Sequence, residues 1–395
     1  MIIVEGGQVL LPDGTRVFGD VALEGDRISA VGQVSTDALD TERVDARGCT
    51  VMPGLVDLHS HLTLVLKDHE TGTTSRATVA LRGARQAVRA LRAGITRCRD
   101  IGGFKHVDID LRNSIEAGLI PGPKMVCAGQ FIAITGGHAW PYTREADGDA
   151  EVRKAAREQI KAGADFLKIV GSGEAIFARD NETWTQFTFD EVRAIVEEAS
   201  AAGTVAAAHV HPEPAIRNAV RAGVKSVEHG THLTSELARM MIDQGTFLIP
   251  TFAITRAIAT SGSWPEMEAW AKRAFATKLE MLQMVLELGV PWGIGTDSGS
   301  MIPVSAIADE FEIIHSLGVS ALEVLQHATQ GNADLWGWSD AGRIASGKVA
   351  DIILVKGDPT SDLSAMRDVE VTIARGKVFD WRKIDLAFGG PLLPA

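Results

Sequence analysis

The sequence predicts an α/β protein: a (β/α)₈ barrel of the TIM-barrel type with a small β-sandwich domain formed by both termini. In the middle of the chain, apolar runs of strand length alternate with stretches rich in Ala, Leu, Glu and Arg. That alternation is typical of a parallel sheet covered by helices. At the two ends, short β-type runs are separated by turns alone. A length of 395 residues fits one barrel with an accessory domain.

Neither end of the chain offers enough strands to fold alone, because a few isolated strands are marginal in water. The first 52 residues contain short β-type runs, with Asp13-Gly14 as a turn signal. The C-terminal part repeats this texture, with Arg375-Gly376-Lys377 as a turn. We therefore expect residues 1–52 and 343–395 to form the β-sandwich domain and residues 53–342 to form the barrel.

The central region contains eight apolar runs that we interpret as the barrel strands. They are Leu55–His61, Gly94–Arg99, Met125–Ile134, Phe166–Val170, Thr204–Val210, Ser226–His229, Phe247–Ile254 and Val290–Thr296. The predicted helices are Thr78–Arg92, Val152–Ala162, Asp190–Ala202, Glu213–Ala222, Ser235–Gln244, Pro265–Leu288 and Ser320–Gln330. Several of these helices are followed by glycine, a common helix stop signal. In such a barrel, chemistry is located at the C-terminal ends of the strands.

Composition indicates a soluble globular enzyme. The net charge is −12, from 39 basic and 51 acidic residues, which argues against nucleic-acid binding. The three cysteines are scattered and suit a reducing compartment, so we expect a cytoplasmic protein. No basic leader and no 18-residue uncharged apolar stretch is present, so we expect no membrane association.

His59 and His61 end the first predicted strand. Residues two apart on a strand point to the same face, and two neutral imidazoles on one face make half of a metal site. Alone, the pair is weak evidence, but further residues of ligand type lie in or at the ends of other predicted strands. These are Lys168, His209, His229 and Asp297. All six are therefore expected to converge at one mouth of the barrel.

Lys168 stands among apolar residues in the fourth predicted strand. A lysine there should be buried, and burial lowers its pKa and favours the neutral amine. A neutral amine can add carbon dioxide to form a carbamate, an anionic ligand able to bridge two metal ions. The alternative is a buried ion pair with Asp100 or Glu174.

This pattern resembles the amidohydrolase superfamily, specifically its binuclear branch with a carboxylated lysine. The matching motifs are Pro53-Gly-Leu-Val-Asp-Leu-His-Ser-His61, Lys168, Ala208-His-Val-His211, Val227-Glu-His229 and Gly295-Thr-Asp297. Finer features are similar to Xaa-Pro dipeptidases, lysine/arginine carboxypeptidases and ochratoxin-type amidases. They include Thr135-Gly-Gly-His138 and Arg99-Asp100.

The resemblance implies two divalent metal ions, most simply Zn²⁺. One ion would be held by His59, His61 and Asp297, and the other by His209 and His229. Lys168, carboxylated on its side-chain nitrogen, would bridge the two. As the ligand from the fifth strand, His209 is preferred over His211, because the twenty-residue step from His209 to His229 matches the family pattern. The alternative is His211, which shares a strand face with His209.

The implied reaction is hydrolysis of an amide or peptide-like C–N bond in a dipeptide, N-acyl amino acid or similar small substrate. A metal-bridging hydroxide would attack the carbonyl carbon. Asp297 would shuttle the proton to the leaving amine. Either His138 or His211 would contact the carbonyl oxygen or the tetrahedral intermediate.

Substrate contacts are less clearly encoded. Arg179 and Arg256 follow predicted strands and are candidates for gripping a substrate carboxylate, although either can equally be a surface residue. Dipeptidase relatives often use a loop tyrosine near the scissile carbonyl, and the single tyrosine here is Tyr142. Either Tyr142 has that role or a histidine replaces it. Relatives are often oligomeric, so we also expect a homo-oligomer.

Two rival interpretations remain. A deaminase or an imidazolone-type cyclic-amide hydrolase would share the fold, but adenosine- and cytosine-type deaminases place His-x-x-Glu on the fifth strand. Here Glu213 follows His209 by four residues, and imidazolone-type hydrolases usually lack the lysine found at position 168. A non-catalytic scaffold protein would typically have lost ligands, whereas all six are present.

Overall fold

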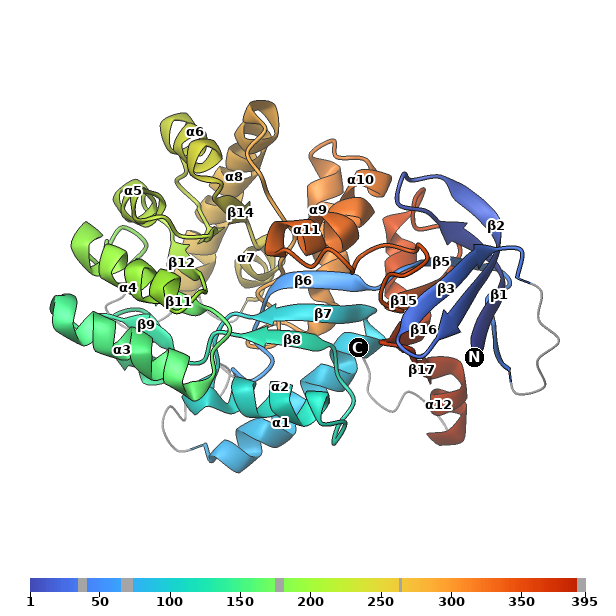
Figure 1. The fold of residues 1–395 in the computed structure, drawn as a ribbon. Helices are drawn as coiled ribbons and strands as arrows, with labels where there is room; N and C mark the ends of the chain where they lie inside the picture. Colours follow the sequence, from blue (N-terminus) through green and yellow to red (C-terminus); the bar gives the residue numbers. More distant parts are fainter. Residues whose placement is uncertain (35–40, 65–73, 175–180, 263–264, 389–395) are drawn as a thin grey trace.

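The structure is a computed structural model that describes residues 1–34, 41–64, 74–174, 181–262 and 265–388. The larger part of the molecule consists of parallel strands surrounded by helices. A separate, eight-stranded sheet lies beside it (Figure 1). The strands of the larger part are β6 (Leu55–Ser60), β7 (Ile95–Asp100), β8 (Lys124–Cys127), β9 (Phe131–Ala133), β10 (Thr143–Glu145), β11 (Leu167–Val170), β12 (Ala206–Val210), β13 (Ser226–His229) and β14 (Phe247–Ile249).

These strands form two parallel sheets, with the orders β6-β7-β8 and β10-β9-β11-β12-β13-β14. Residues 290–298 lie between the free sides of β14 and β6. Leu248 N donates to Pro291 O at 2.9 Å on one side, and Leu58 N donates to Ile294 O at 3.1 Å on the other. Strands and helices thus form a TIM-barrel-like α/β fold.

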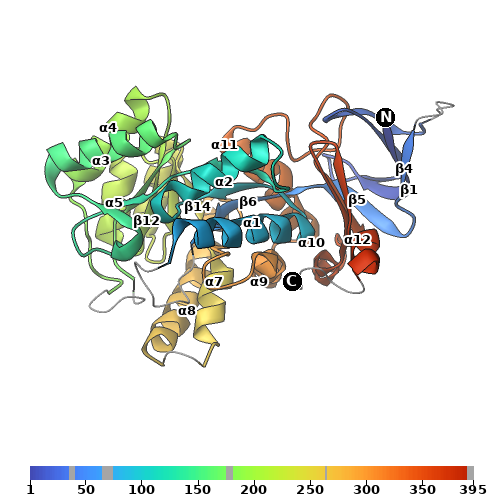
Figure 2. The same cartoon turned by 90° about the horizontal axis from the view of Figure 1, so that it is seen from below.

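Helices cover the outside of these strands, as Figures 1 and 2 show. They are α1 (Arg76–Arg92), α2 (Val107–Glu116), α3 (Gly148–Ala162), α4 (Phe189–Ala201), α5 (Glu213–Ala222), α6 (Ser235–Gln244), α7 (Phe252–Ala259), α8 (Pro265–Leu288), α9 (Ile307–Ser316), α10 (Ala321–Gln326) and α11 (Asn332–Trp336). The predicted glycine stops are confirmed at α3 and α5, where Gly163 and Gly223 take left-handed conformations that cost a glycine little.

The predicted strand Phe247–Ile254 is wrong in its second half. The strand ends at Ile249, and residues 252–259 form α7 instead. Glu310 explains the change, because its carboxylate accepts hydrogen bonds from Phe252 N at 3.0 Å and Ala253 N at 2.6 Å. These two backbone donors start a helix and would otherwise lie buried without a partner. The predicted run Met125–Ile134 is also interrupted, giving β8 and β9.

Strands from both ends of the chain form one eight-stranded sheet. Its order is β17-β16-β15-β5-β1-β2-β3, and β4 pairs with β1. The bounds are β1 (Ile2–Leu10), β2 (Arg16–Glu24), β3 (Arg27–Gly32), β4 (Glu42–Asp45), β5 (Cys49–Pro53), β15 (Ile352–Lys356), β16 (Val369–Ala374) and β17 (Lys377–Asp380), followed by α12 (Trp381–Phe388). The join is antiparallel pairing between β5 and β15, where Val51 faces Leu354.

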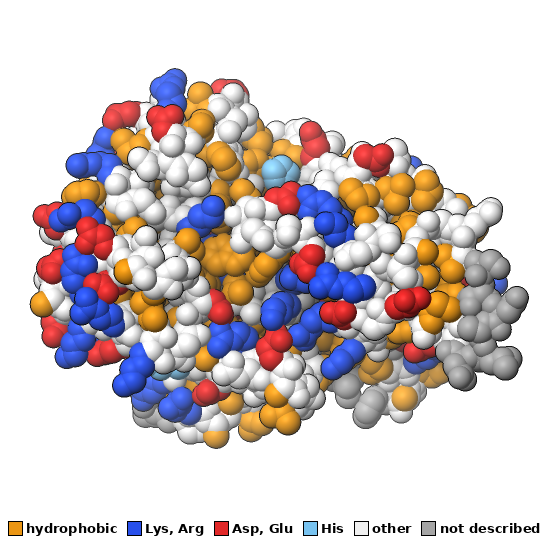
Figure 3. All heavy atoms as spheres, in the orientation of Figure 1, with side chains coloured by type: hydrophobic (Ala, Val, Ile, Leu, Met, Phe, Trp, Pro, Cys, Tyr) orange, Lys and Arg blue, Asp and Glu red, His pale blue; other side chains and the backbone are white. Residues whose placement is uncertain are grey.

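The surface of the larger part carries interspersed charges, visible over α3 and α4 in Figure 3. Arg153 on α3, for example, pairs with Glu197 on α4 at 2.6 Å. In the part of the chain that the structure describes, no helix is both long and apolar enough to span a bilayer.

A buried ion pair connects the two parts of the molecule. Arg97 on β7 donates from Nε to Asp351 Oδ2 at 2.8 Å, and the side chains are 7% and 2% exposed. Asp351 also accepts a hydrogen bond from Arg375 N at 2.8 Å. A charge buried this deeply depends on its partner.

We expect Asp351→Asn to lower the free energy of unfolding by about 3–5 kcal/mol, because it leaves the Arg97 charge buried and unpaired. The matched control is Glu5→Gln, which breaks an exposed pair with Arg43 (2.6 Å) and should cost about 0–1 kcal/mol. Urea unfolding of the three proteins measures both effects. Equal losses for the two variants would contradict the prediction.

Candidate metal centre

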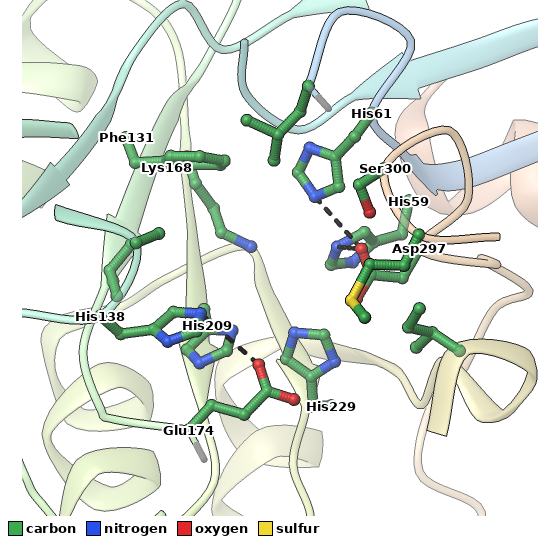
Figure 4. Close-up of a pocket in the computed structure, with 15 residues that line it drawn as sticks. His59, His61, Phe131, His138, Lys168, Glu174, His209, His229, Asp297 and Ser300 are labelled. Carbon is green, nitrogen blue, oxygen red and sulfur yellow. Dashed lines mark ion pairs between the residues drawn. The ribbon is translucent and has the colours of Figure 1, made fainter. Parts of the chain in front are cut away.

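The six predicted ligands line one cavity at the C-terminal ends of the parallel strands. His59 and Lys168 lie on β6 and β11, His61 directly follows β6, and His209 and His229 lie on β12 and β13. Asp297 comes from the segment that hydrogen-bonds to β6. Figure 4 shows these side chains facing one another. The cavity is also lined by Leu64, Phe131, His138, Ala139, Val170, Glu174, Ile254, Ser300 and Met301.

One group of ligand atoms gathers around Asp297. The Nε2 atoms of His59 and His61 lie 3.6 Å and 3.3 Å from Asp297 Oδ1. The Nδ1 atoms of the same two rings also form hydrogen bonds. His59 Nδ1 donates to Glu228 Oε2 at 2.8 Å, and His61 Nδ1 donates to Gly102 O at 2.9 Å. Both acceptors bind the Nδ1 proton and so turn the Nε2 atom of each ring toward Asp297 and the cavity.

A second group consists of His209, His211 and His229, whose ligand atoms lie within 4.8 Å of one another. Burial holds the pKa of all three well below the usual range, so the rings are neutral. The Nε2 atoms of His209 and His211 are buried with no hydrogen-bond partner. Buried, unpartnered, neutral imidazole nitrogens fit a divalent metal ion as their missing partner.

The structure distinguishes His209 from His211 by position. His209 lines the cavity, whereas His211 does not. His211 stacks on the ring of His229 at a centroid distance of 5.0 Å, and its Nδ1 hydrogen-bonds to Thr231 Oγ1 at 2.8 Å. The cavity side of the cluster is therefore formed by His209 and His229.

Lys168 reaches into the cavity between the two groups (Figure 4). Its side chain is 2% exposed, and burial lowers the pKa of the amine to about 8. Among the described residues it forms no ion pair, so the alternative partners Asp100 and Glu174 are not used. Asp100 accepts a hydrogen bond from Leu62 N at 2.9 Å, and Glu174 Oε2 lies 3.5 Å from His138 Nε2. The amine therefore remains available for chemistry.

Burial and neighbouring charges shift the pKa values of His59, His61 and Asp297. Burial lowers the pKa of His59 to about 4. Burial also acts to lower the pKa of His61, but the hydrogen bond to Asp297 and its charge outweigh it and raise that pKa. Burial would raise the pKa of Asp297, but His59 and His61 outweigh it and keep the carboxylate ionised. Asp297 is thus an anion beside two imidazoles, a suitable ligand set for a cation.

Non-glycine residues at this mouth have left-handed backbones, namely Ala139 (φ 59°), His229, Thr251 and Asp297. The φ angles are 67° at His229, 52° at Thr251 and 58° at Asp297. Such conformations cost on the order of 1–3 kcal/mol each and are found mainly at functional sites. Specific contacts hold two of them: Asp297 N donates to His59 O at 2.7 Å, and Thr251 Oγ1 hydrogen-bonds to His229 Nδ1 at 2.7 Å.

Besides Asp297, one more of the predicted catalytic and substrate residues lines the cavity, His138, whereas His211, Tyr142 and Arg256 do not. The His138 ring stacks on that of His209 at 4.7 Å. Tyr142 packs in an apolar cluster against Phe104, because its short helical turn points the ring inward. Arg256 on α7 is directed to Asp309 at 3.1 Å instead of into the cavity. Arg179 lies outside the described residues.

Sequence reasoning missed the residues that orient the ligands. Glu228 lies behind His59 and also accepts from Arg99 Nη2 at 2.7 Å. A charged residue inside a short buried strand is the signal that could have found it, and the same signal pointed to Lys168. Thr251 gave no comparable signal, because a threonine is common at the end of any strand.

Comparison with known proteins agrees with this geometry. The model of the amidohydrolase family matches residues 50–379. Ochratoxinase of Aspergillus niger is 28% identical over 405 residues, covering 93% of this chain and 83% of that protein.

Solved structures are similar over nearly the whole chain. A Xaa-Pro dipeptidase with bound methionine is 30% identical with a TM-score of 0.88, covering 96% of this chain and 99% of that one. A prolidase complexed with N-methylphosphonate-L-proline is 31% identical, with the same TM-score and coverage.

The chain therefore belongs to the amidohydrolase family. It is an enzyme of the class that hydrolyses C–N bonds. Members of this family generally use divalent metal ions, and the His and Asp groups described above can hold such ions.

We expect Thr251→Val to weaken binding of a divalent ion about 10–100-fold, because it removes the hydroxyl that orients His229 while keeping the side-chain shape. Thr251→Ser should restore binding. Competition against a chelator measures the affinities, using Co²⁺ as the added metal.

The matched control is Thr255→Val. Thr255 accepts a hydrogen bond from the buried Lys278 at 2.8 Å in the same region but does not touch His229. An equal loss of affinity in both valine variants would assign the effect to local packing and not to the His229 hydrogen bond.

Proposed function

We propose that this protein is a binuclear metal-dependent hydrolase of an amide or peptide-like C–N bond in a small molecule. The observation that carries the proposal is the position of Lys168. This buried amine lies between two groups of ligand atoms and forms no ion pair with any residue that the structure describes. A carboxylated lysine in that place would connect the two groups.

The proposed ligand set follows the two groups. His59, His61 and Asp297 would hold one ion, His209 and His229 would hold the other, and Lys168 in its carboxylated form would be a ligand shared by both. Zn²⁺ is the simplest choice for a set of imidazole and carboxylate ligands. When bound, the two ions lower the pKa of a water molecule and polarise the substrate carbonyl.

Two protein side chains transfer the proton and stabilise the developing charge. Asp297 accepts the proton of the attacking water and delivers it to the leaving amine. Its side chain is 18% exposed and faces the cavity, which supports this role. His138 donates a hydrogen bond to the oxygen of the tetrahedral intermediate. Its place in the cavity lining favours it over His211, which lies behind His229.

We propose a dipeptide, N-acyl amino acid or similar small amide as the substrate. The likeness to the Xaa-Pro dipeptidase and prolidase structures supports this class. In the described part of the chain, no arginine lines the cavity.

The proposal includes the finer points of architecture. Residues 290–298 serve as the eighth strand of a closed barrel, supported by their hydrogen bonds to β14 and β6. Residues 1–52 and 343–395 form a separate β-sandwich domain, supported by an apolar core of their own that includes Val21, Val51 and Leu354. We also propose a homo-oligomer acting on a small molecule without nucleic acid or membrane partners. Three free, buried cysteines support a reducing compartment such as the cytoplasm.

We expect Lys168→Ala to abolish turnover and to lower the metal content from about two ions to one or fewer per chain, because the bridging ligand is lost. Metal analysis and assays on the same preparations measure this. Near-normal activity in Lys168→Ala would disprove the bridging role.

The carbamate itself has a direct readout. Protein reconstituted with metal and ¹³C-bicarbonate should give a carbamate carbonyl resonance in ¹³C NMR spectra. Lys168→Arg is the matched control, since a guanidinium keeps the charge but does not form the carbamate. A resonance of equal strength in both proteins would place the carbamate elsewhere.

A panel of dipeptides, N-acyl amino acids and aryl amides tests the substrate class. We expect release of an amine or amino acid, detected by liquid chromatography and mass spectrometry. Purine and cytosine nucleosides are the control, because a deaminase would release ammonia from them. Ammonia release without amide cleavage would favour the deaminase interpretation.

A further inference from the structure

A second cavity, of about 210 Å³, lies between the end of α1, the start of α9 and the turn before β16. Two short 3₁₀ helices contribute to its walls, η3 (Val304–Ala306) and η5 (Leu363–Arg367). The lining residues include Arg89, Arg92, Arg367, Val304, Ile307 and Met366. None of them lines the metal cavity, so this is a distinct site.

The wall of this second cavity combines apolar side chains with charged ones, among them one carboxylate, Asp368. Val304, Ile307 and Met366 are 1%, 2% and 3% exposed, so their side chains belong to the packed core and give the cavity a fixed shape. Pockets that bind small molecules combine such apolar walls with a few placed polar groups. A matching ligand therefore needs a compact apolar body.

Two of the three arginines in the wall already have anionic partners. Arg92 donates to Asp385 at 2.8 Å from Nη1 to Oδ1. Arg367 donates to Asp309 at 2.6 Å and to Glu312 at 2.9 Å. Their charges are balanced within the protein.

Arg89 is different. Among the described residues it forms no ion pair, and its Nε atom is buried with no hydrogen-bond partner. Burial and the neighbouring charge of Arg85 lower the pKa of Arg89, whereas the hydrogen bond to Asp309 raises the pKa of Arg367. Within the described chain, the partly buried guanidinium of Arg89 therefore lacks a negatively charged partner and an acceptor for its Nε–H group.

Gln86 makes only a weak contact with the Arg89 guanidinium. Gln86 Nε2 donates to Gly299 O at 3.2 Å, and Gln86 Oε1 lies 3.5 Å from Arg89 Nη1. That contact is long, so it leaves the donors of the guanidinium available for a stronger acceptor. A planar acceptor with two oxygens fits such a guanidinium.

We propose that this second cavity binds a small carboxylate with a compact apolar body, and that Arg89 is the residue that grips it. A carboxylate matches the fork of the guanidinium and supplies the missing negative charge. The apolar body fills the space against Val304, Ile307 and Met366. The site is independent of the proposed reaction at the metal centre.

Titration calorimetry with benzoate tests the proposal on the metal-loaded protein. We expect saturable binding of benzoate, and none of benzamide, which has the same ring without the charge. Acetate, which has the charge without the ring, should bind at least tenfold more weakly than benzoate. Absence of benzoate binding at millimolar concentration would overturn the proposal.

Matched variants on α1 separate this site from carboxylate binding at the metal centre. Arg89→Gln should weaken benzoate binding at least tenfold, and Arg85→Gln should change it less than twofold, because Arg85 is exposed and does not line the cavity. Melting temperatures show whether both variants are folded. Equal affinities in the two variants would contradict the role of Arg89.

A crystal grown with 4-iodobenzoate locates the ligand independently of any variant. The iodine should give an anomalous peak between α1 and η5, with the carboxylate beside Arg89. A peak confined to the metal cavity would overturn the proposal even if calorimetry detects binding.

Discussion

The buried carboxylate of Glu228 is the interaction on which the arrangement of the metal site depends. Burial would raise its pKa, but Arg99 and His59 outweigh burial and keep it ionised. It accepts hydrogen bonds from both of these residues and from Ser226 Oγ at 2.5 Å. One anion therefore links β6, β7 and β13, and removing it would leave the Arg99 charge without a partner in the core. The same anion fixes which nitrogen of His59 faces the cavity, so folding and ligand orientation share one contact.

The site combines rigid supports with local strain. Arg99 lies over the aromatic rings of Phe166, Phe247 and Trp336, with its guanidinium carbon 5.0–5.7 Å from their centroids. This packing keeps the base of the cavity stiff. At the mouth, by contrast, His229 and Asp297 take unfavourable backbone conformations. Close packing at the base supports the strained backbone at the mouth. Active sites commonly have this arrangement, because catalysis needs precise side-chain positions even where they cost local stability.

The sequence allowed prediction of most strands and of the six residues that meet in one cavity, because each depends on a local pattern. A histidine pair two apart, or a lysine among apolar residues, carries its signal within a few positions. The left-handed turn at Thr251 and the helix after it could not be predicted in this way, because they depend on Glu310, which is distant in sequence. The position of Arg256 outside the cavity could not be predicted for the same reason, since its ion-pair partner Asp309 belongs to α9. Contacts between distant segments decide where a long side chain points.

The pairing of β5 with β15 has a consequence for how the protein is made. Residues 49–53 are synthesised early, but their partners at 352–356 emerge from the ribosome only after the parallel strands have been completed. Until then β5 has an open edge, and an open edge of apolar residues is prone to pair with other chains. Contacts of such high sequence separation also slow folding. The pairing between β5 and β15 therefore forms only after the whole series of parallel strands has been synthesised.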